Sequence, residues 1–549
     1  MLILPLLTLC FGLCEALVYS DYSVNSQRLP NFNTEWNFDI HAGHVPLTEN
    51  NSTYYFIDFV QRKANEKRPL TVWLNGGPGC SSMDGAFLEV GPLRTGPLHQ
   101  HSGWLEETDL VFLDQPLGTG YNHKDPKDDY DGELTVIAAR FISWIKQYLS
   151  MVQETANYQD IYIAGESYAG QYIPHFADAM VKDEELKDLL KGVMLGNPWL
   201  APNLQGLSFV PFSIKNNVID MTDKDTQQKV EELLSEQESC QLHKEGFESP
   251  QCESLLNSFL QKFKMNDKCI NVYNVDLIDS FPQCGSNWPP ELTKMTSWLN
   301  NPLIQDVLNT VPPNGYNTLS ESGKWKECNN KVFAHFRPHN SVIGAELLSG
   351  LLEEDVEVLI FVGDKDLICN YIGVEMVLRQ YLSDYVDLPR LDTKSINKRE
   401  IEEIEMDYSW LHNGVQLGSV WRRGRLSYVK VKDASHMVGY DVEGAGIVEL
   451  ITRNDIGKDG IIETGNSEKS SSNSSNESNN NSNENIQTSS KQLVALLVLM
   501  VILGVLGLYL IYSSVSISYT PISRKKKKVH WRDLEELEDE IELNNIQKP

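Results

Sequence analysis

The chain has 549 residues and a formal net charge of −29, because 76 acidic side chains outnumber 47 basic ones. A nucleic-acid partner is not expected on this balance, since binding to phosphates needs clustered positive charge. The two ends of the chain carry apolar segments, which indicate the secretory pathway and its membranes.

The first apolar segment, residues 1–13, is almost uncharged and rich in Leu, Ile and Phe. Cys14-Glu15-Ala16 follows and places small residues at the two positions that signal peptidase reads. We therefore expect a cleaved signal peptide over residues 1–16. A buried N-terminal helix is the alternative, but the run has neither an amphipathic period nor an N-cap.

Several short apolar runs rich in Val, Ile and Leu end in a glycine or a turn, and helix-length segments separate many of them. This alternation is typical of a mostly parallel sheet covered by helices on both faces. This alternation stops between about residue 200 and about residue 342, where the sequence is helical and contains cysteines. We expect an inserted cap there. One lumenal domain over residues 17–462 accounts for all of this. The predicted strands are 70–74, 109–114, 160–165, 191–197, 356–364 and 426–431.

The segment Trp73–Pro92, WLNGGPGCSSMDGAFLEVGP, leaves the first of these strands in a glycine run. Glycines let backbone N–H groups approach a reacting oxygen, which is the geometry of an oxyanion hole. A plain Gly-Pro turn is the alternative. It does not explain why Asn75, two glycines and Glu89 occur together.

The stretch GESYAG, Gly165–Gly170, places Ser167 between a predicted strand and a helix that begins near Tyr168. This pattern matches the nucleophile elbow of the α/β-hydrolase fold, although Ala169 stands where G-x-S-x-G has its second glycine. One such match is weak evidence, since most are structural turns. In this fold an acid and then a histidine must follow along the chain.

Both partners follow, each at the end of a predicted strand. FVGDKDLICN offers Asp364 and Asp366, and DASHMVGYD offers His436. A histidine on such a loop is by itself more often structural. Three groups in the required order predict an α/β-hydrolase fold, in which the histidine acts as base for Ser167 and the acid orients the imidazole.

The C-terminal part reads as a stalk, a membrane span and a tail. Residues 463–491 are dominated by Ser, Asn and Glu and contain almost nothing apolar, so we expect a disordered stalk. Residues 493–512 form an uncharged apolar run of the length that a membrane span needs. RKKKK at Arg524–Lys528 marks the cytosolic side, which makes 513–549 a cytosolic tail. Glycosylation sequons begin at Asn50, Asn51, Asn473, Asn476 and Asn480.

Four motifs together, WLNGGPGCSS, GESYAGQYIP, GDKDLICN and HMV, resemble the serine carboxypeptidases. The resemblance covers Trp73–Tyr440 and implies a hydrolase that removes single residues from peptide C-termini, with no metal and no cofactor. It implies the triad Ser167, Asp366 and His436. It also implies an oxyanion hole at Gly77 and Tyr168, and a site for the substrate carboxylate at Asn75, Gly76, Glu89 and Glu166.

A glutamate beside the nucleophile needs an explanation, because a carboxylate repels the oxyanion. If Glu89 and Glu166 share a proton, burial and like-charge repulsion raise the apparent pKa of the pair. The protonated pair then donates to the terminal carboxylate of the substrate. We also expect Asp84, Cys369 and Met437 to set substrate selectivity. For Asp84 an exposed turn aspartate is the alternative, because Met-Asp-Gly is a good turn sequence.

Seven cysteines remain after removal of the signal peptide, so we expect three disulfides and one free thiol. The family's pairing pattern implies Cys80–Cys328, Cys240–Cys252 and Cys269–Cys284, with Cys369 free. One departure from the family is Gly439-Tyr440, where Pro-Phe usually follows His-Met-Val. It implies a less rigid loop next to His436.

Signal peptide, cap, stalk, span and acidic tail together resemble the fungal pheromone-processing branch of the family, a carboxypeptidase D of the trans-Golgi network. This resemblance implies peptide substrates with C-terminal Lys or Arg and a single-pass membrane anchor. An acyltransferase or esterase and a non-catalytic binding protein are the alternatives. The intact triad argues against a binding protein, and the complete carboxylate site argues against an acyltransferase. The oligomeric state is left open.

Overall fold

The computed structural model describes residues 18–30, 36–62, 67–93, 103–241, 247, 249–312, 324–391, 401–442, 444–452 and 460–465. The predicted signal peptide, the membrane span, the tail, nearly all of the stalk and the sequons at Asn473, Asn476 and Asn480 lie outside these residues. No helix of the described residues is both long and apolar enough to cross a membrane. The chain divides into two units, Met1–Glu468 and Lys469–Pro549, and everything described below belongs to the first.

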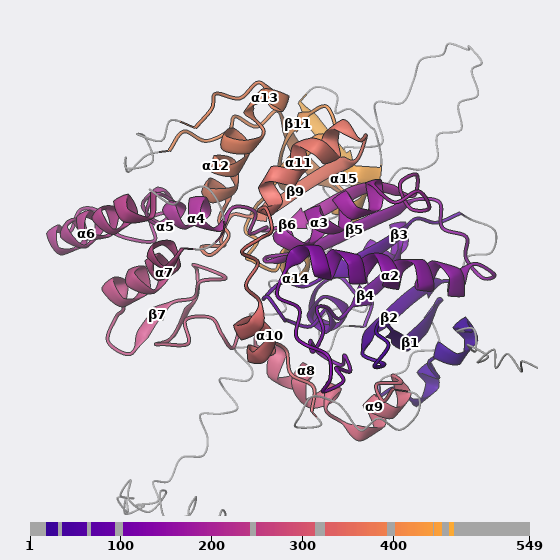
Figure 1. The fold of residues 1–549 in the computed structure, drawn as a ribbon. Helices are drawn as coiled ribbons and strands as arrows, with labels where there is room; N and C mark the ends of the chain where they lie inside the picture. The colour runs from indigo at the N-terminus through magenta and orange to yellow at the C-terminus, as the bar shows by residue number, and fades with distance from the viewer. Residues whose placement is uncertain are drawn as a thin grey trace, which may run out of the picture. The chain divides into compact units, whose positions relative to one another are not determined.

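An eleven-stranded sheet forms the centre of this unit, in the order β1-β2-β4-β3-β5-β6-β9-β12-β11-β10-β13 (Figure 1). The six strands from β4 to β12 are parallel to one another. The strands are β1 (Phe38–Pro46), β2 (Thr53–Gln61), β3 (Leu70–Leu74), β4 (Asp109–Leu113), β5 (Ile161–Glu166), β6 (Leu190–Gly196), β9 (Glu357–Gly363), β10 (Tyr408–His412), β11 (Val415–Arg423), β12 (Leu426–Val431) and β13 (Ile461–Thr464).

The six central strands correspond to the six predicted ones, and the mixed sheet with helices confirms the predicted fold class. Their sequences could be recognised because strands buried on both faces are continuous apolar runs. Every residue of β3, β4 and β5 is buried. The flanking strands were not predicted. Most of them pair antiparallel, as β1 does with β2 and β11 with β12.

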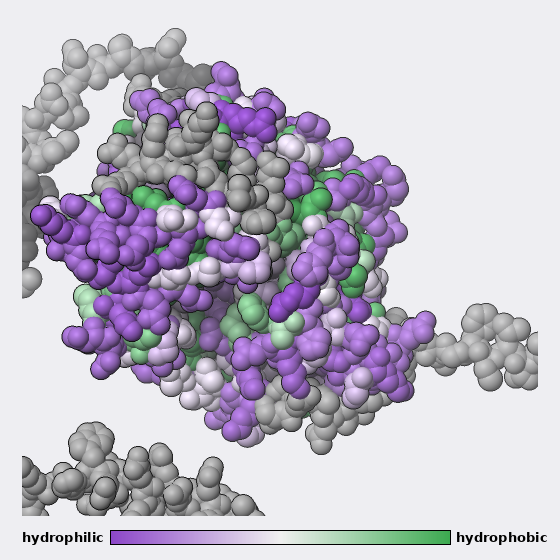
Figure 2. Space-filling view, turned by 60° about the vertical axis from the view of Figure 1, so that its left-hand side comes forward, coloured by the Kyte–Doolittle hydropathy of each residue, from purple (hydrophilic) through white to green (hydrophobic). Residues whose placement is uncertain are grey.

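Helices cover both faces of the sheet. Leu70, Val72 and Leu74 of β3 share a core with four helices, α2 (Leu134–Val152), α3 (Ala169–Val181), α11 (Gly344–Glu353) and α12 (Tyr371–Tyr381). Trp73 of the same strand belongs to a second core with α1 (Gly103–Glu107) and α15 (Ala445–Thr452). Because side chains alternate along a strand, the two cores lie on opposite faces. The face in Figure 2 is mostly hydrophilic, as the large net charge suggests.

Between β6 and β9 the chain leaves the sheet and forms a cap-like insertion. Two of its helices, α6 and α7, are joined by the Cys240–Cys252 disulfide. The insertion was predicted to be helical, yet it also contains a small antiparallel sheet of β7 and β8. Its elements are α4 (Pro202–Gln205), α5 (Phe209–Lys215), α6 (Lys224–Gln241), α7 (Pro250–Phe263), β7 (Lys268–Ile270), β8 (Ile278–Ser280), α8 (Leu292–Leu299), α9 (Pro302–Val307) and α10 (Asn330–His335).

The described residues form three disulfides, Cys80–Cys328, Cys240–Cys252 and Cys269–Cys284, and leave Cys369 free. These are the pairs that the resemblance implied. Cys80 lies in the loop after β3 and Cys328 lies shortly before α10, 248 residues further along the chain. This disulfide therefore ties the end of the insertion to the loop that leaves the central sheet.

Candidate active site

Ser167 occupies the sharp turn between β5 and α3. Its backbone has φ +59°, in the left-handed region where non-glycine residues are strained. The turn is held because Ser167 N donates to Gly196 O at 3.0 Å and Gly170 N donates to Ser167 O at 3.0 Å. Gly165 cannot be replaced, since an added Cβ would clash with Leu74 O. The strained turn lifts the serine side chain out of the end of the sheet.

His436 and Asp366 meet at the ends of two neighbouring strands, β12 and β9. His436 Nδ1 lies 2.8 Å from Asp366 Oδ2, and the two residues are 4% and 0% exposed. Asn197 Nδ2 donates to the same oxygen at 2.7 Å. The other predicted acid, Asp364, instead accepts a hydrogen bond from Asp433 N at 2.9 Å. The geometry therefore favours Asp366 as the partner of the histidine.

The neutral imidazole fits this environment in one tautomer. With Nδ1–H donated to Asp366, the other ring nitrogen is left for the serine. The backbone N–H of His436 donates to Tyr273 O at 2.9 Å, and the two rings lie 5.1 Å apart. These contacts fix the position of the ring. Both His436 and Ser167 line the same cavity.

Asp366, Cys369 and His436 also present three possible metal ligands within 4.8 Å of one another. Two ligands of one tetrahedral zinc ion lie about 3.3 Å apart, as follows from bond lengths near 2 Å. The contact of 2.8 Å between Nδ1 and Oδ2 is shorter and matches a charge-assisted hydrogen bond. The cluster is thus better explained as a histidine–acid pair with a neighbouring thiol.

The glycine run after β3 brings backbone against the nucleophile. A Cβ on Gly76 would clash with the amide nitrogen of Tyr168, and would lie 2.9 Å from Ser167 Cβ. Gly77 has φ +113°, which side chains rarely allow. Only glycine at both positions lets this backbone pass so close to the serine. The backbone next to the predicted N–H pair of Gly77 and Tyr168 thus lies close to the nucleophile, and Gly77 lines both cavities that Ser167 lines.

Asn75 connects the two glutamates that flank the serine. Its Nδ2 donates to Glu89 Oε1 and to Glu166 Oε1, both at 3.0 Å. Its Oδ1 accepts from Trp73 Nε1 at 2.8 Å and from Gly85 N at 3.0 Å, which fixes the orientation of the amide. Four predicted residues of the carboxylate site, Asn75, Gly76, Glu89 and Glu166, therefore surround one point beside Ser167.

The charge state of this group follows from its burial. Glu89 is 0% and Glu166 is 7% exposed. Burial, the nearby charge of Glu89 and a hydrogen bond with Glu89 raise the pKa of Glu166 well above its usual value, and Asp84 adds to the effect. A raised pKa keeps a proton between the two carboxyl groups. The glutamate next to the nucleophile can then act as a donor.

Two further carboxyl groups lie in the same cavity, which has a volume of about 440 Å³. Asp84 is only 6% exposed, so the alternative of an exposed turn aspartate is wrong. Its Oδ1 has no hydrogen-bond partner among the described residues. Burial and the charges of Glu327, Glu89 and Asp114 raise the pKa of Asp84 well above its usual value. We call Asp84 and Glu327 the acidic pair.

Glu327 was not among the residues predicted from the sequence. Burial raises the pKa of this residue to about 7. It precedes Cys328, whose disulfide with Cys80 brings it to the glycine loop, and Ser81 N donates to Glu327 O at 2.8 Å. The expected Cys80–Cys328 pairing was the available signal, because the neighbours of a disulfide lie near the partner's loop.

A second cavity of about 510 Å³ also borders the nucleophile and shares Gly77, Pro78, Ser167, Phe333 and Ile368 with the first. Its walls are mainly apolar and include Trp199, Phe209, Phe247, Leu256, Phe333 and Phe336. We call it the apolar cavity and the first one the acidic cavity.

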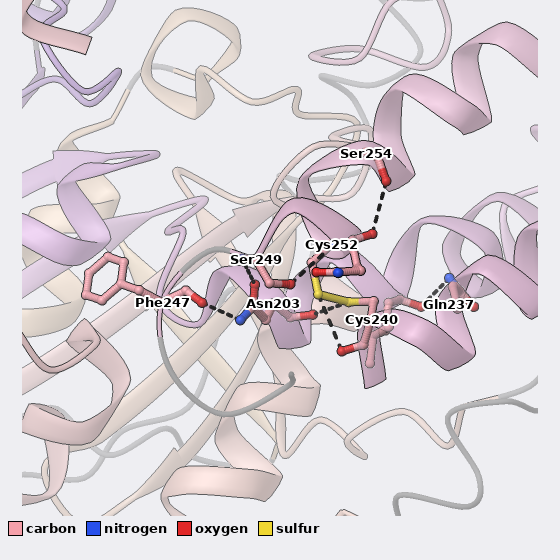
Figure 3. Close-up of a disulfide and its surroundings, with 9 residues drawn as sticks. Asn203, Gln237, Cys240, Phe247, Ser249, Cys252 and Ser254 are labelled. Atoms are coloured by element: carbon pink, nitrogen blue, oxygen red, sulfur yellow. Dashed lines mark hydrogen bonds between the residues drawn. A yellow bond between two sulfur atoms is a disulfide. The ribbon is translucent and has the colours of Figure 1, made fainter. Parts of the chain in front are cut away.

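The α6–α7 hairpin of the insertion forms one wall of the apolar cavity. Asn203 donates to Phe247 O and accepts from Ser249 N at 2.9 Å. Ser249 caps α7 by accepting from Cys252 N, next to the disulfide with Cys240 (Figure 3). The disulfide and these hydrogen bonds hold Phe247 beside the first turn of α7. They thereby fix the shape of the wall.

The remaining predicted residues also lie at the site. Cys369 is buried in the apolar cavity, and Met437 lines the acidic one.

The loop after His436 contains Gly439, where the sequence departs from the family pattern. Gly439 packs against the segment of Glu89, since an added Cβ would lie 2.7 Å from Val90 Cγ1 and 3.3 Å from Glu89 Cβ. Tyr440 OH donates to Glu291 Oε2 at 2.7 Å, which links this loop to the residue before α8.

The α/β fold has a strained serine at a strand–helix turn and a buried histidine–aspartate pair. These features define a hydrolase of the α/β-hydrolase class. The family model for serine carboxypeptidases matches residues 30–452. The chain belongs to this family and is a serine-type carboxypeptidase.

Two relatives illustrate the similarity. The pheromone-processing carboxypeptidase KEX1 of Ogataea parapolymorpha is 34% identical over 465 residues, which are 80% of this chain and 71% of the relative. That of Arthroderma otae is 36% identical over 77% of this chain and 65% of its own length. The relatives are thus longer than the part they share with this chain.

A solved structure supports the fold directly. The crystal structure of KEX1(delta)p, a prohormone-processing carboxypeptidase from Saccharomyces cerevisiae, superposes with a TM-score of 0.69 and 31% identity. The match covers 82% of this chain and 100% of that one.

Proposed function

We propose that Ser167, His436 and Asp366 form the catalytic triad of this carboxypeptidase. His436 takes the Ser167 proton as the hydroxyl oxygen attacks the peptide carbonyl, and later gives it to the leaving amine. Asp366 holds the tautomer and stabilises the imidazolium. The N–H groups of Gly77 and Tyr168 donate to the oxyanion, and removal of one such donor typically costs about 3 kcal/mol.

The enzyme acts only at free C-termini, because Asn75, Glu89 and Glu166 bind the terminal carboxylate. The observation that supports this is the buried Asn75–Glu89–Glu166 cluster directly beside the nucleophile, with both glutamates 3.0 Å from Asn75 Nδ2. A carboxylate held there leaves room for one residue between the chain end and the bond that is cut. The test compares the cleavage of two peptides of the same sequence, one with a free C-terminal carboxylate and one with a C-terminal amide. Only the peptide with the free carboxylate should be cleaved.

The last residue that this enzyme removes is preferentially Lys or Arg. The acidic pair carries this preference, since Asp84 and Glu327 line the cavity that Asn75 and Glu166 also line. The Oδ1 atom of Asp84 is buried and has no hydrogen-bond partner among the described residues. Burying such a group without a partner costs about 1–3 kcal/mol, and a substrate ammonium or guanidinium supplies the missing donor.

The physiological setting that we propose is precursor processing in the trans-Golgi network, with the catalytic domain in the lumen. Three features support it: the expected signal peptide, the apolar run over residues 493–512 with RKKKK after it, and three disulfides, which form in oxidising compartments. The relatives named above are pheromone-processing or prohormone-processing carboxypeptidases.

The selectivity is tested by kcat/KM for paired peptides that end in Lys or in Leu. We expect the wild type to favour Lys by about tenfold to hundredfold, and Asp84→Asn and Glu327→Gln each to lose most of that factor. Glu253→Gln is the matched control, because Glu253 is an acidic residue of the apolar cavity. An unchanged Lys-to-Leu ratio in both Asp84→Asn and Glu327→Gln would remove the acidic pair from this role.

A further inference from the structure

The hairpin turn between β1 and β2 carries two overlapping glycosylation sequons, Asn50-Asn51-Ser52 and Asn51-Ser52-Thr53. The sequence alone gives both asparagines the same standing, because each is followed by a hydroxyl residue two positions later. The structure separates them. Their side chains face different surroundings, and only one of them is available to carry a sugar in the folded protein.

Asn50 is part of a hydrogen-bonded cluster around Asp128. Its Nδ2, the atom to which a glycan is attached, donates to Asp128 Oδ1 at 2.7 Å. Thr48 Oγ1 donates to Asp128 Oδ2 at 2.6 Å, and Ser52 Oγ donates to the same oxygen. Although partial burial favours the neutral carboxyl, these three hydrogen bonds lower the pKa of Asp128. The Asn50 amide is therefore one of three donors that stabilise a carboxylate.

A sugar on Asn50 would replace one hydrogen of that amide and place a bulky ring against Asp128. The site is half-buried, and the neighbouring Ser52 is fully buried. Ser52 Oγ also accepts from Asp125 N at 2.9 Å, which ties the turn to the loop that carries Asp128. A glycan at Asn50 would therefore disturb a contact between two segments of the domain.

Asn51 differs in each of these respects. It is exposed, and its side chain forms no hydrogen bond within the described part of the chain. Its backbone has φ +65°, the left-handed conformation that Asn tolerates at the tip of a turn, and Asn51 N donates to Thr48 O at 3.0 Å. The turn thus presents this amide to solvent without using it for structure.

We propose that Asn51, and not Asn50, carries an N-linked oligosaccharide in the mature protein, at the tip of the β1–β2 hairpin. The inference rests on the proposed lumenal placement, because the attachment of such glycans takes place in the secretory pathway. The hairpin includes β1, an edge strand of the sheet. An oligosaccharide beside an edge strand also obstructs pairing with strands of other molecules.

The test uses the full-length protein expressed in a eukaryotic secretory host. A glycosidase that converts each glycosylated Asn to Asp is applied, and the peptide around residues 50–53 is sequenced by mass spectrometry. We expect conversion at Asn51 and an intact Asn50. Conversion at Asn50 with an intact Asn51 would overturn the proposal.

Two variants form a matched pair, since each leaves the other sequon intact. Asn50→Gln should keep the oligosaccharide, and Asn51→Gln should lose it; the opposite pattern would overturn the proposal. Ser52→Ala removes the Asn50 sequon alone, and it should also keep the oligosaccharide even if folding is impaired. If the stalk sequons carry oligosaccharides and the hairpin carries none, the Asn51 proposal is contradicted and the lumenal placement is not. If no sequon of the chain carries an oligosaccharide, both proposals are contradicted.

Discussion

The two cavities that border Ser167 differ in the chemistry of their walls. The acidic cavity contains Glu166 at the end of β5, Asp84 in the loop after β3, and Glu327, which precedes the cysteine that is bonded to that loop. The apolar cavity includes several aromatic side chains and one wall from the α6–α7 hairpin, together with Glu253 and Arg337. We expect a peptide that crosses the nucleophile to meet more carboxyl groups on one side of the bond that is cut than on the other. Phe333 and Ile368 line both cavities, whereas the three carboxyl groups line only the acidic one, so a charged last residue should be selected mainly there.

The largest effect is expected at the point that both cavities share. Ser167→Ala should lower kcat by about 10⁶-fold, the scale seen when a serine nucleophile is removed, because neither cavity can cleave without it. The unfolding temperature should stay close to that of the wild type, since the substitution removes one hydroxyl from a turn held by backbone bonds. Substantial residual turnover in a preparation free of wild type would assign the nucleophile elsewhere.

The next effect concerns the proton shared in the acidic cavity. The pKa of Glu166 is raised well above its usual value, so the glutamate pair keeps its proton at a pH where a free glutamate is charged, and loses it as the pH rises through the raised pKa. KM for peptide acids should therefore rise with pH, by up to about tenfold per unit above the pKa. Steady-state kinetics from pH 4.5 to 8 measure this rise.

The control for that experiment is the Glu89→Gln, Glu166→Gln double variant, which has no carboxyl proton to lose at this site. Its KM should depend far less on pH than that of the wild type. An identical pH dependence in the two proteins would show that the shared proton has no part in binding the carboxylate.

A smaller effect should appear in the selectivity of the acidic cavity. The pKa of Glu327 is raised to about 7, so its carboxyl is neutral below that pH and charged above it. The ratio of kcat/KM for Lys-ending over Leu-ending peptides should therefore increase between pH 6 and pH 8. Both substrates present the same terminal carboxylate, so the glutamate pair cancels in the ratio. In Glu327→Gln the slope should be smaller, with any remainder due to Asp84, whose pKa is also raised. An unchanged slope in that variant would exclude Glu327 as the titrating group.

The apolar cavity can be perturbed alone through its disulfide. Removal of the 12-residue Cys240–Cys252 link by double substitution with Ser should lower stability by about 2–4 kcal/mol. It should also lower kcat/KM for peptides with an aromatic penultimate residue, because Phe247 is held beside that link. The Lys-to-Leu ratio at the last position should not change. A change in that ratio would mean that the two cavities are coupled.

The smallest effect on turnover is expected at Cys369, a buried thiol that lines the apolar cavity. Burial and the charges of Asp366 and Glu166 raise its pKa well above the usual value, and a hydrogen bond with Ser167 opposes this. Cys369→Ser should keep kcat within about threefold, as expected for a near-isosteric change. The wild type should be inhibited by mercurials and the variant should not; equal inhibition would point to another target.

The central strands and the triad could be read from the sequence because their signals are local. Continuous apolar runs marked the strands, and each of the residues Ser167, Asp366 and His436 follows one of them. Choosing between Asp364 and Asp366 required the family resemblance, since both follow β9 by a few residues. The structure separates them by a contact that spacing cannot reveal, 2.8 Å from Asp366 Oδ2 to His436 Nδ1.

Other features depend on distant parts of the chain and could not be read in this way. The burial of Asp84 arises from packing around the glycine loop, whereas its Met-Asp-Gly context suggested an exposed turn. Glu327 reaches the cavity through a disulfide across 248 residues. The small sheet of β7 and β8 has strands of three residues, too short for a periodic pattern.

The contrast between the two cavities is tested most directly by two peptides of the same composition. One ends in Phe-Lys and the other in Lys-Phe, and both have free C-termini. Release of the last residue by the purified lumenal domain is followed by mass spectrometry to obtain kcat/KM. We expect the Phe-Lys peptide to be cleaved about a hundredfold faster, since lysine then enters the acidic cavity and phenylalanine the apolar one. Equal rates, or a preference for Lys-Phe, would contradict it.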